Sequence, residues 1–599
     1  MNKIINIAVV AHVDAGKSTL VDAMLSQSGV FRDNETVVDC VMDSNDLERE
    51  RGITIYSKNC AINYEGVKIN IVDTPGHADF SSEVERVIKT VDTVILLVDA
   101  AEGVMPQTRF VLQKALHEGL KPILFINKID KKDSRVEEAV NETFDLFVEL
   151  GATDEQLDFP IIYGIGKLGI AKKSIDEDSS DLKPLFDTIF SHVNSYEGNE
   201  SDPLQLQISS LDYDDYIGRL GIGRVLKGTI KSGSMVSVCR KDGTTTNCRI
   251  TKLFVNQGLN RVEVKEAYYG DIVVVAGIDK VMIGETVCDP SKVEALPMIE
   301  IEEPTLSMNF LVNSSPFAGT GKYVTTRQIK DRLEKELEVN VGLKVEDLED
   351  TDGYKVSGRG ELHLSVLLEN LRREGYELSV SKPEVLIKYI DDVKCEPYEK
   401  VLINLPDEFS GTVINDLNER KGLLSKIETD MGYTKLEFIV PTRGLIGYRS
   451  NFITNTKGEG IMVRSFDSYK PYAGVIQGRK NGVLVSMENG KTFAYSLFSL
   501  GDRGIMIVEP ATDVYIGQII GINNKDNDLN VNPCKNKQLT NTRASGSDDA
   551  IALIKPKVFT LEEALEFIEY DELVEITPAS IRLRKKILDP NMRKRSYKD

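Results

Sequence analysis

The sequence predicts a multidomain protein that combines α/β and β folds. Its 599 residues exceed the length at which a single hydrophobic core stops growing. At about 150 residues per domain, this length suggests roughly four domains. Hydrophobic residues make up 41% of the chain and charged residues 28%, a balance typical of ordinary globular folding, so buried cores can form. Sequence patterns typical of strands alternate with patterns typical of helices near the N-terminus, which indicates an α/β fold. Patterns of short strands follow, which indicates a β fold.

The N-terminal region has the pattern of a parallel sheet. Short apolar runs rich in Ile and Val stand at 4–11, 67–73, 93–99 and 121–127. Helical patterns such as 18–26 and 107–118 separate these runs. This alternation implies crossover connections and a mostly parallel sheet covered on both faces. We therefore predict an α/β domain over residues 1–199.

The rest of the chain predicts four further domains. Residues 200–295 carry short alternating segments with glycine turns, which predict a β-barrel. Residues 300–390 and 394–477 each mix alternating strands with amphipathic helices, which predict two compact, ferredoxin-like α+β modules. Residues 478–599 combine strand-like runs, a polar middle rich in Gly and Asn, and a short helix at 561–569. The fold of this last domain is the hardest to predict from its sequence.

Cysteine and apolar patterns indicate the cellular setting. The seven Cys residues form no CxxC motif and no pairing rhythm, so neither a disulfide framework nor a zinc site is indicated. A reducing cytoplasm is the expected location. No run approaches the roughly 18 apolar residues of a membrane span. The stretch from Lys3 to Val13 has the pattern of a first strand rather than an export signal. We expect a soluble protein with no membrane partner.

A phosphate-binding loop follows the first predicted strand. Residues 11–19 read AHVDAGKST and then open a helix, as such a loop requires. Successive backbone N–H groups and the helix N-terminus can hold the α- and β-phosphates. Lys17 should reach the β- and γ-phosphates, and the Ser18 hydroxyl should bind Mg²⁺. Ala11 stands where the general pattern has Gly. The predicted nucleotide contacts here are Asp14, Ala15, Gly16, Lys17, Ser18 and Thr19.

Two further motifs follow the phosphate-binding loop along the chain, each after a predicted strand. Asp73 begins the segment DTPGH after one strand, and NKID follows another strand at Asn127, Lys128, Ile129 and Asp130. Asp73 can hold Mg²⁺ through water, and the Gly76 N–H can contact the γ-phosphate. Asp130 can accept two hydrogen bonds from guanine that adenine does not offer. GTP is therefore predicted in preference to ATP.

Thr54 and His77 are the candidates nearest the reaction. Thr54 lies in a polar segment and can close over Mg²⁺ and the γ-phosphate, while an ordinary Thr at the start of a strand is the alternative. His77 directly follows the segment Asp-Thr-Pro-Gly and can orient the attacking water. With Lys17 stabilising negative charge, we predict attack of water on the γ-phosphate without a covalent intermediate. The predicted catalytic residues are His77, Lys17 and Thr54.

The element that supports the guanine ring is poorly matched. Ile165 and Gly166 stand where Ser and Ala are expected. The Gly166 N–H can still serve the guanine oxygen, but the hydroxyl that normally braces the loop is missing. The effect of Ile165 on guanine affinity stays open at this point.

Seven segments carry a resemblance to a known family. Residues 43–54, 73–80 and 127–130 are similar to the translation-factor GTPases. Residues 357–364 resemble the third domain of elongation factor G, and residues 441–447 resemble the BipA version of the module after it. Residues 539–547, with the helix at 561–567, are similar to the C-terminal domain peculiar to BipA. The whole chain thus resembles the BipA (TypA) family of ribosome-associated GTPases.

This resemblance implies five domains without the tRNA-mimicking fourth domain of elongation factor G. It implies a ribosome-binding GTPase that acts in large (50S) subunit assembly and in translation under stress or low temperature. Mg²⁺ is the implied cofactor, and K⁺ near Asp14 is a further hypothesis. The implied partners are GTP and GDP, 50S and 70S ribosomes, rRNA and A-site tRNA, and we expect a monomer. A LepA-like factor and a GTP-dependent regulator acting off the ribosome remain alternatives.

The charge distribution suggests where RNA binds. The formal net charge is -21, yet basic residues gather between Arg582 and Lys598. Nucleic acid binding rewards such clusters, although charge runs are more often solvated faces. The candidates for RNA contact are Lys535, Lys537, Arg543, Arg582, Arg584, Lys585 and Lys586.

Overall fold

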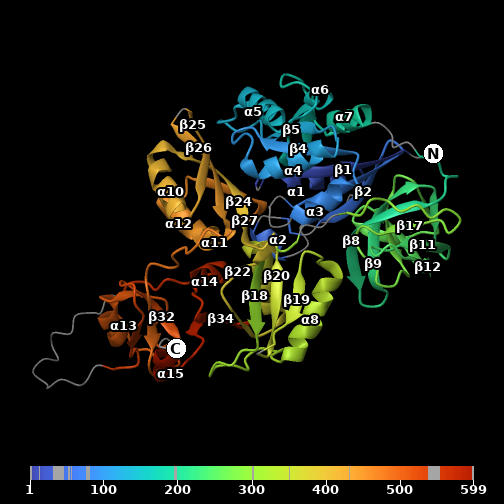
Figure 1. Cartoon of the computed structure of the whole chain (residues 1–599). Coiled ribbons are helices and arrows are strands. Elements are labelled where there is room, and N and C mark those ends of the chain that lie inside the picture. Colours follow the sequence, from blue (N-terminus) through green and yellow to red (C-terminus); the bar gives the residue numbers. More distant parts are fainter. Residues whose placement is uncertain are drawn as a thin grey trace, which may run out of the picture. The chain divides into compact units, whose positions relative to one another are not determined.

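Figure 1 shows the computed structural model of the whole chain, coloured along the sequence. The chain forms two compact units. One contains Met1–Glu302 with Glu336–Val341, and the other contains Glu303–Lys335 with Gly342–Asp599. The structure describes residues 3–12, 14–30, 46–51, 54–55, 57–75, 81–193, 198–299, 303–349, 351–430, 432–536 and 553–596. No helix within these ranges is long and apolar enough to cross a membrane.

A seven-stranded sheet, ordered β2-β3-β1-β4-β5-β6-β7, forms the N-terminal α/β domain. The strands are β1 (Ile4–Ala11), β2 (Lys58–Tyr64), β3 (Val67–Asp73), β4 (Thr93–Asp99), β5 (Ile123–Asn127), β6 (Ile161–Ile165) and β7 (Ile170–Lys172). The strands from β3 to β6 in this order pair in parallel, and β2 and β7 pair antiparallel at the two edges. Their near-continuous apolar runs are buried on both faces, which confirms the predicted parallel sheet.

Helices cover both faces of this sheet. They are α1 (Lys17–Gln27), α2 (Asp46–Arg51), α3 (Ser81–Ile88), α4 (Pro106–His117), α5 (Val136–Glu149), α6 (Asp154–Leu157), the 3-10 turn η2 (Gly166–Leu168) and α7 (Lys183–His192). Residues of α1 and α7 pack into one apolar cluster, and residues of α3, α4 and α5 pack into the other. The loops that carry the predicted nucleotide motifs leave the carboxyl ends of β1, β3 and β5, which places them along one edge of the sheet.

A β-barrel follows in the same unit. Its main sheet has the order β12-β11-β17-β8-β9-β16-β13-β14, and β10 pairs with β15. The strands are β8 (Gln205–Asp214), β9 (Gly218–Lys227), β10 (Thr229–Lys231), β11 (Met235–Cys239), β12 (Thr245–Arg249), β13 (Lys252–Gln257), β14 (Asn260–Glu263), β15 (Glu266–Tyr268), β16 (Ile272–Ala276) and β17 (Thr286–Cys288). Polar contacts join barrel and α/β domain: Lys68 Nζ lies 2.8 Å from each carboxylate oxygen of Asp271, and Arg224 pairs with Asp92.

The second unit begins with an antiparallel sheet flanked by helices. Its strand order is β19-β20-β18-β21-β34-β35, with β22 paired to β18. The elements are β18 (Leu306–Leu311), α8 (Thr326–Val339), β19 (Lys344–Asp347), β20 (Gly353–Gly358), α9 (Glu361–Glu374), β21 (Leu378–Val380), β22 (Glu384–Val385), β34 (Glu572–Ile576) and β35 (Ile581–Lys585). Strands β34 and β35 come from the far C-terminal stretch. They extend the sheet of the 300–390 module through antiparallel pairing of β34 with β21.

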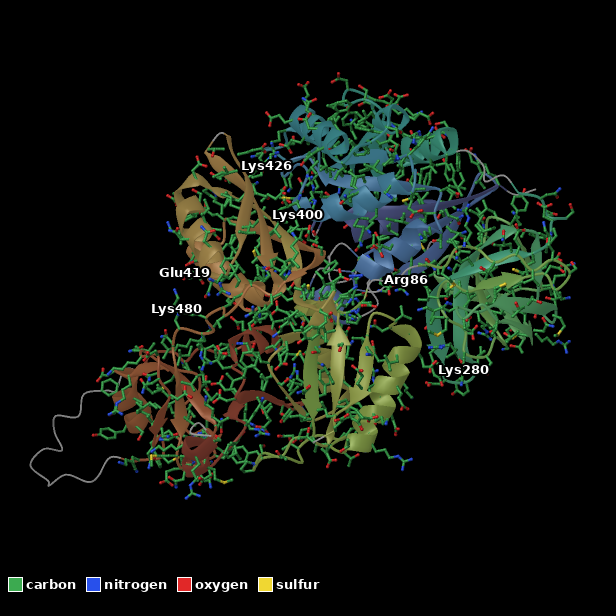
Figure 2. All side chains as sticks on the ribbon, in the orientation of Figure 1. Arg86, Lys280, Lys400, Glu419, Lys426 and Lys480 are labelled. Carbon is green, nitrogen blue, oxygen red and sulfur yellow. The ribbon has the colours of Figure 1, made fainter. Side chains whose placement is uncertain are left out.

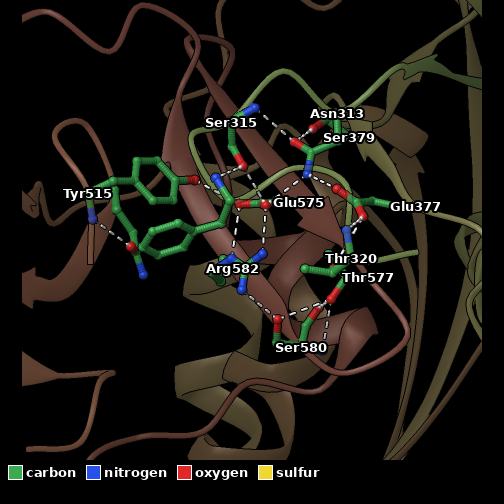
Figure 3. A network of polar contacts seen from close by, with 12 residues as sticks. Asn313, Ser315, Thr320, Glu377, Ser379, Tyr515, Glu575, Thr577, Ser580 and Arg582 are labelled. Carbon is green, nitrogen blue, oxygen red and sulfur yellow. Dashed lines mark hydrogen bonds and ion pairs between the residues drawn. The ribbon is translucent and has the colours of Figure 1, made fainter. Parts of the chain in front are cut away.

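A buried polar cluster holds β34 and β35 against the loop that follows β18 (Figure 3). The Glu575 carboxylate is fully buried and accepts hydrogen bonds from Asn313 (2.8 Å), Ser315 (2.6 Å) and Tyr515 (2.8 Å). Arg582 forms an ion pair with it at 2.7 Å. Burial alone raises the pKa of Glu575, but the hydrogen bonds from Arg582, Ser315 and Asn313 outweigh it and lower this pKa to about 2. The cluster is therefore held as an ion pair.

The next module contains a five-stranded antiparallel sheet. Its order is β23-β24-β26-β25, with β27 on the other edge of β24. The elements are β23 (Lys388–Ile390), β24 (Val393–Pro406), α10 (Asp407–Glu419), β25 (Leu423–Asp430), β26 (Tyr433–Pro441), α11 (Thr442–Leu445), α12 (Tyr448–Asn455) and β27 (Ile461–Pro471). Lys400 of β24 pairs with Glu437 of β26 at 2.8 Å, and Lys400 is labelled in Figure 2 together with Lys426 of β25. The helices pack on one apolar cluster.

The C-terminal region has a small sheet of its own, ordered β30-β32-β28-β33, and β29 pairs with β31. Its elements are β28 (Val483–Ser486), β29 (Gly490–Lys491), α13 (Ala494–Gly501), β30 (Gly504–Met506), β31 (Asp513–Val514), β32 (Ile519–Asn523), β33 (Leu529–Val531), α14 (Leu561–Phe567) and α15 (Pro590–Ser596). The predicted fold class of α/β domain, β-barrel, α+β modules and C-terminal domain is confirmed. The sharing of a sheet between residues 306–385 and 572–585 was not predicted.

Candidate nucleotide-binding site

The phosphate loop joins the end of β1 to the start of α1. Gly16 precedes the helix with a φ of 96°, a left-handed conformation that favours glycine. A Cβ at this position would lie 2.5 Å from Asn127 Nδ2, so the loop and the strand-end residue approach too closely for any side chain. The Asn127 amide also donates to the carbonyl of Ala15 at 2.7 Å. The loop is thus shaped by its contact with the NKID segment.

Lys17, Thr54 and Asp73 meet beside this loop. The Lys17 ammonium lies 2.8 Å from Asp73 Oδ1 and donates to Thr54 Oγ1 and to the Thr74 carbonyl, both at 2.6 Å. The Thr54 hydroxyl in turn donates to Asp73 Oδ2 at 3.2 Å. Thr54 and Asp73 are both buried. Three residues that lie far apart in the sequence are thus brought together, with the Lys17 ammonium among the oxygen atoms of Thr54, Asp73 and Thr74.

The oxygen donors at this point suit Mg²⁺. A buried carboxylate at Asp73 and a hydroxyl at Thr54 are hard ligands, and Ser18 lies half-buried in the first turn of α1. In the described part of the chain, no group of three or more His, Cys, Asp or Glu residues could hold a metal ion. Mg²⁺ ordinarily binds one or two protein oxygens together with waters and phosphates, so it does not require such a group.

The NKID segment contacts the phosphate loop through two side chains, those of Asn127 and Lys128. Lys128 has a φ of 61° and donates from Nζ to the Asp14 carbonyl at 2.5 Å. Asn127 is buried, and its Oδ1 accepts from the Gly166 N–H at 2.8 Å. This bond braces the loop in which Ile165 replaces the expected Ser. Asp130 is exposed, so its carboxylate is accessible to a ligand.

Sequence reasoning missed Asp99, which ends β4 and is fully buried. Its carboxylate pairs with Lys128 at 2.9 Å and with Lys131 at 3.1 Å, and it accepts from the Ala101 N–H at 2.8 Å. Burial alone raises the pKa of Asp99, but these partners lower it to about 2. A carboxylate that ends the apolar run at 94–98, beside the strand carrying NKID, was the available signal.

His12 was also missed. Its ring is buried, and Nε2 lies 2.9 Å from Glu102 Oε2, which ties the phosphate loop to the segment after β4. Burial lowers the pKa of His12, although Glu102 opposes that shift.

The other predicted nucleotide contacts differ in how far they are exposed. Ala15 is buried, Thr19 is half-buried and Asp14 is exposed with a φ of 64°. Ile129 follows Lys128 and is half-buried. Gly76 and His77 lie outside the described residues.

The structure contradicts part of the RNA-contact prediction. Arg584 and Lys585 are buried in β35, and the Arg582 guanidinium pairs with buried Glu575. Lys585 Nζ lies 2.8 Å from Asp571 and 2.9 Å from Glu572, so its charge is neutralised inside the fold. Burial lowers the pKa of Lys585, but Glu572 and the hydrogen-bonded carboxylates raise it above its ordinary value. These three residues are structural.

Two other RNA candidates have the expected exposure. Lys535 and Lys586 are exposed. Lys537 and Arg543 lie outside the described residues.

Comparison with known proteins gives four family matches along the chain. The Elongation factor Tu GTP binding domain matches residues 2–195, and Elongation factor Tu domain 2 matches residues 218–288. The Elongation factor G C-terminus matches residues 393–480, and the TypA/BipA C-terminal domain matches residues 481–590. A crystal structure of a protein from Thermus thermophilus, ttk003000868, covers 79% of this chain and 98% of its own at 17% identity and a TM-score of 0.55, which shows a shared fold.

Relatives align over the full length. The chain is 53% identical over 600 residues to the Large ribosomal subunit assembly factor BipA of Bacillus subtilis (strain 168), covering 100% of this chain and 98% of the relative. It is 52% identical to the protein of the same name from Synechocystis sp., over 97% of this chain and 98% of the relative. With a GTP-binding domain and relatives of this similarity along its whole length, the chain belongs to the BipA family of translational GTPases.

Proposed function

We propose that this GTPase binds the ribosome and acts in assembly of the large (50S) subunit and in translation under stress or low temperature. The observation that carries the proposal is the meeting of Lys17, Thr54 and Asp73 beside the phosphate loop, in a chain whose full-length relatives are named large ribosomal subunit assembly factors. Such a meeting suits a switch that responds to the γ-phosphate.

The same proposal assigns the nucleotide contacts. The backbone of Asp14 to Thr19 holds the phosphates, Lys17 binds the β- and γ-phosphates, and Gly76 contacts the γ-phosphate. Asn127 to Asp130 binds guanine, with the exposed Asp130 carboxylate accepting from the base. Ser18, Thr54 and, through water, Asp73 hold Mg²⁺, and Asp14 is the proposed neighbour of a K⁺ ion.

In the proposed reaction, water attacks the γ-phosphate. His77 orients that water, and Lys17 stabilises the charge that spreads over the phosphate oxygens. Mg²⁺, when bound, neutralises charge on the β- and γ-phosphate oxygens. Thr54 and Asp73 are positioned for this because the Thr54 hydroxyl already contacts the Asp73 carboxylate. When the γ-phosphate leaves, Thr54 loses its ligand and the segment around it is released.

The proposed partners are 50S and 70S ribosomes, rRNA and A-site tRNA, with the cytoplasm as location and a monomer as the working form. Exposed Lys535 and Lys586 support RNA contact through the C-terminal region, together with Lys537 and Arg543. The proposed division is 1–199, 200–295, 300–390, 394–477 and 478–599, although the last two strands complete the sheet of the third part.

GTP hydrolysis by the wild type and by His77→Ala, with and without purified ribosomes in Mg²⁺, tests the proposal. Ribosomes should raise the wild-type rate at least tenfold, which corresponds to ~1.4 kcal/mol of barrier. His77→Ala should bind GTP with unchanged affinity and show no stimulation. An unchanged wild-type rate, together with no co-sedimentation with 50S or 70S particles, would favour a regulator that acts off the ribosome.

A further inference from the structure

Glu48 is a buried carboxylate that the GTP site as described so far does not use. It lies in the short helix α2, and it is fully buried although Arg49 and Glu50, which follow it in the helix, are exposed. An isolated charge in such a place is strongly unfavourable, so a buried carboxylate has to be paired. The partners of Glu48 therefore indicate why it is there.

Both oxygens of Glu48 contact the stretch that contains Thr54. Oε1 accepts a hydrogen bond from the Ile55 N–H at 2.9 Å, and Oε2 pairs with the Lys58 ammonium. Ile55 directly follows Thr54 and is itself fully buried. Lys58 begins β2, where it lies opposite Asp73 in the β2–β3 register. One carboxylate thus holds the chain directly after Thr54 and again where the strand beside Asp73 begins.

We propose that Glu48 is a positioning residue for GTP hydrolysis. By fixing Ile55 and Lys58, it keeps the Thr54 hydroxyl against Asp73 and Lys17, where the contacts are 3.2 Å and 2.6 Å long. Glu48 acts through the backbone of Ile55 and through Lys58. The inference rests on the proposed role of Thr54 at the γ-phosphate side of the site.

This arrangement distinguishes the two nucleotides. GDP has no γ-phosphate, so its binding relies on the phosphate loop and NKID rather than on Thr54. Loss of Glu48 should therefore weaken binding of the triphosphate and leave binding of the diphosphate nearly unchanged. A hydrogen bond to a charged group is worth enough to change affinity by roughly 10- to 100-fold.

The test compares variants of the full-length chain. Glu48→Ala removes both contacts, Glu48→Gln keeps an oxygen for the Ile55 N–H, and Lys58→Met removes the ion pair alone. Asp46→Ala is the matched control, because Asp46 is exposed on the same helix and its 3.7 Å contact with Arg49 is a surface pair of little energetic weight. Equilibrium binding of GDP and of a nonhydrolysable GTP analogue is measured in Mg²⁺, with hydrogen exchange of a peptide that contains Ile55.

Glu48→Ala should lose at least tenfold in affinity for the GTP analogue, change less than twofold for GDP, and speed exchange at Ile55. Glu48→Gln should lose less than Glu48→Ala, and Asp46→Ala should behave as the wild type. Equal losses for both nucleotides, or no loss, would overturn the inference. If Glu48→Ala does not fold, Glu48→Gln and Lys58→Met decide by the same comparison.

Thr54→Ala separates the two proposals. If Thr54→Ala selectively weakens binding of the GTP analogue while Glu48→Ala does not, the proposed role of Thr54 stands and the proposed role of Glu48 is refuted. If Thr54→Ala has no selective effect, both fail. If both are selective, the double variant should be no weaker than Thr54→Ala alone, because the two residues act through one contact.

Discussion

Breaking the Glu575–Arg582 pair should release the C-terminal strands from the sheet that they complete. The folded protein holds the pKa of Glu575 at about 2, against an ordinary value of 4.5. That difference corresponds to ~3 kcal/mol of stability, since each pKa unit is worth about 1.4 kcal/mol. Loss of one partner from a buried ion pair costs about 3–5 kcal/mol, which agrees. Glu575→Ala should therefore weaken the β21–β34 junction by this amount.

Hydrogen exchange measures that opening directly. Peptides that cover β21 and β34 should exchange roughly 100-fold faster in Glu575→Ala, because ~3 kcal/mol of local opening energy is lost. Peptides from β26, in a different sheet, serve as the internal control. Replacing both partners, as Glu575→Gln with Arg582→Met, should restore part of the protection, since no charge is left unpaired. Unchanged exchange at β21 and β34 in Glu575→Ala would refute the argument.

Three further outcomes are expected. As the pH falls from about 4.5 toward 2, Glu575 and Asp99 should become protonated, and the stability that their lowered pKa values contribute above that range should be lost. Arg582→Met raises the pKa of Glu575. The midpoint of acid unfolding of this variant, measured by circular dichroism, should therefore lie at a higher pH than that of the wild type. Gly16→Ala should abolish GTP binding in a calorimetric titration, because the new Cβ would lie 2.5 Å from Asn127 Nδ2 at a φ of 96°; full binding would contradict the tight loop. Lys586→Ala should weaken RNA binding and flatten its salt dependence with an unchanged unfolding temperature, whereas Lys585→Met should lower that temperature, and the reverse pattern would show that burial does not separate the two lysines.

Motifs whose residues lie close along the chain could be predicted from sequence. The loop before Lys17 follows an apolar strand and opens a helix, so its position in the sheet followed from local pattern alone. The approach of Asp73 to Lys17 was also predictable, because β1 and β3 are parallel and their carboxyl ends share one edge of the sheet. Thr54 precedes β2, which pairs antiparallel with β3, so its place beside Lys17 did not follow from the parallel pattern. The contacts that brace these motifs could not be predicted from the sequence, because Asp99 and Glu48 are recognised chiefly by their burial in the folded chain.

The basic C-terminal region shows why charge alone misleads. Counting cations from Arg582 onward indicated a surface patch, but the carboxylates that neutralise Lys585 and Arg582 stand just before it, at Asp571, Glu572 and Glu575. A hairpin brings the two sets into register, and that pairing depends on which strand each residue occupies. The hairpin completes a sheet only because β34 also pairs with β21, far earlier in the chain. Pairing across so long a separation is not encoded in a local pattern, so the shared sheet, and the burial that it brings, could not be predicted.

The shared sheet also has a consequence for the folding of the chain while it is being synthesised. Strand β21 pairs with residues close to the C-terminus. A ribosome that adds about 5–20 residues per second needs roughly 10–40 s to synthesise an interval of about 200 residues. Until then the edge of β21 that pairs with β34 has no partner. An open strand edge is a template for association with other chains. The nascent chain thus passes through an interval in which this edge is open to association, until its own last strands cover it.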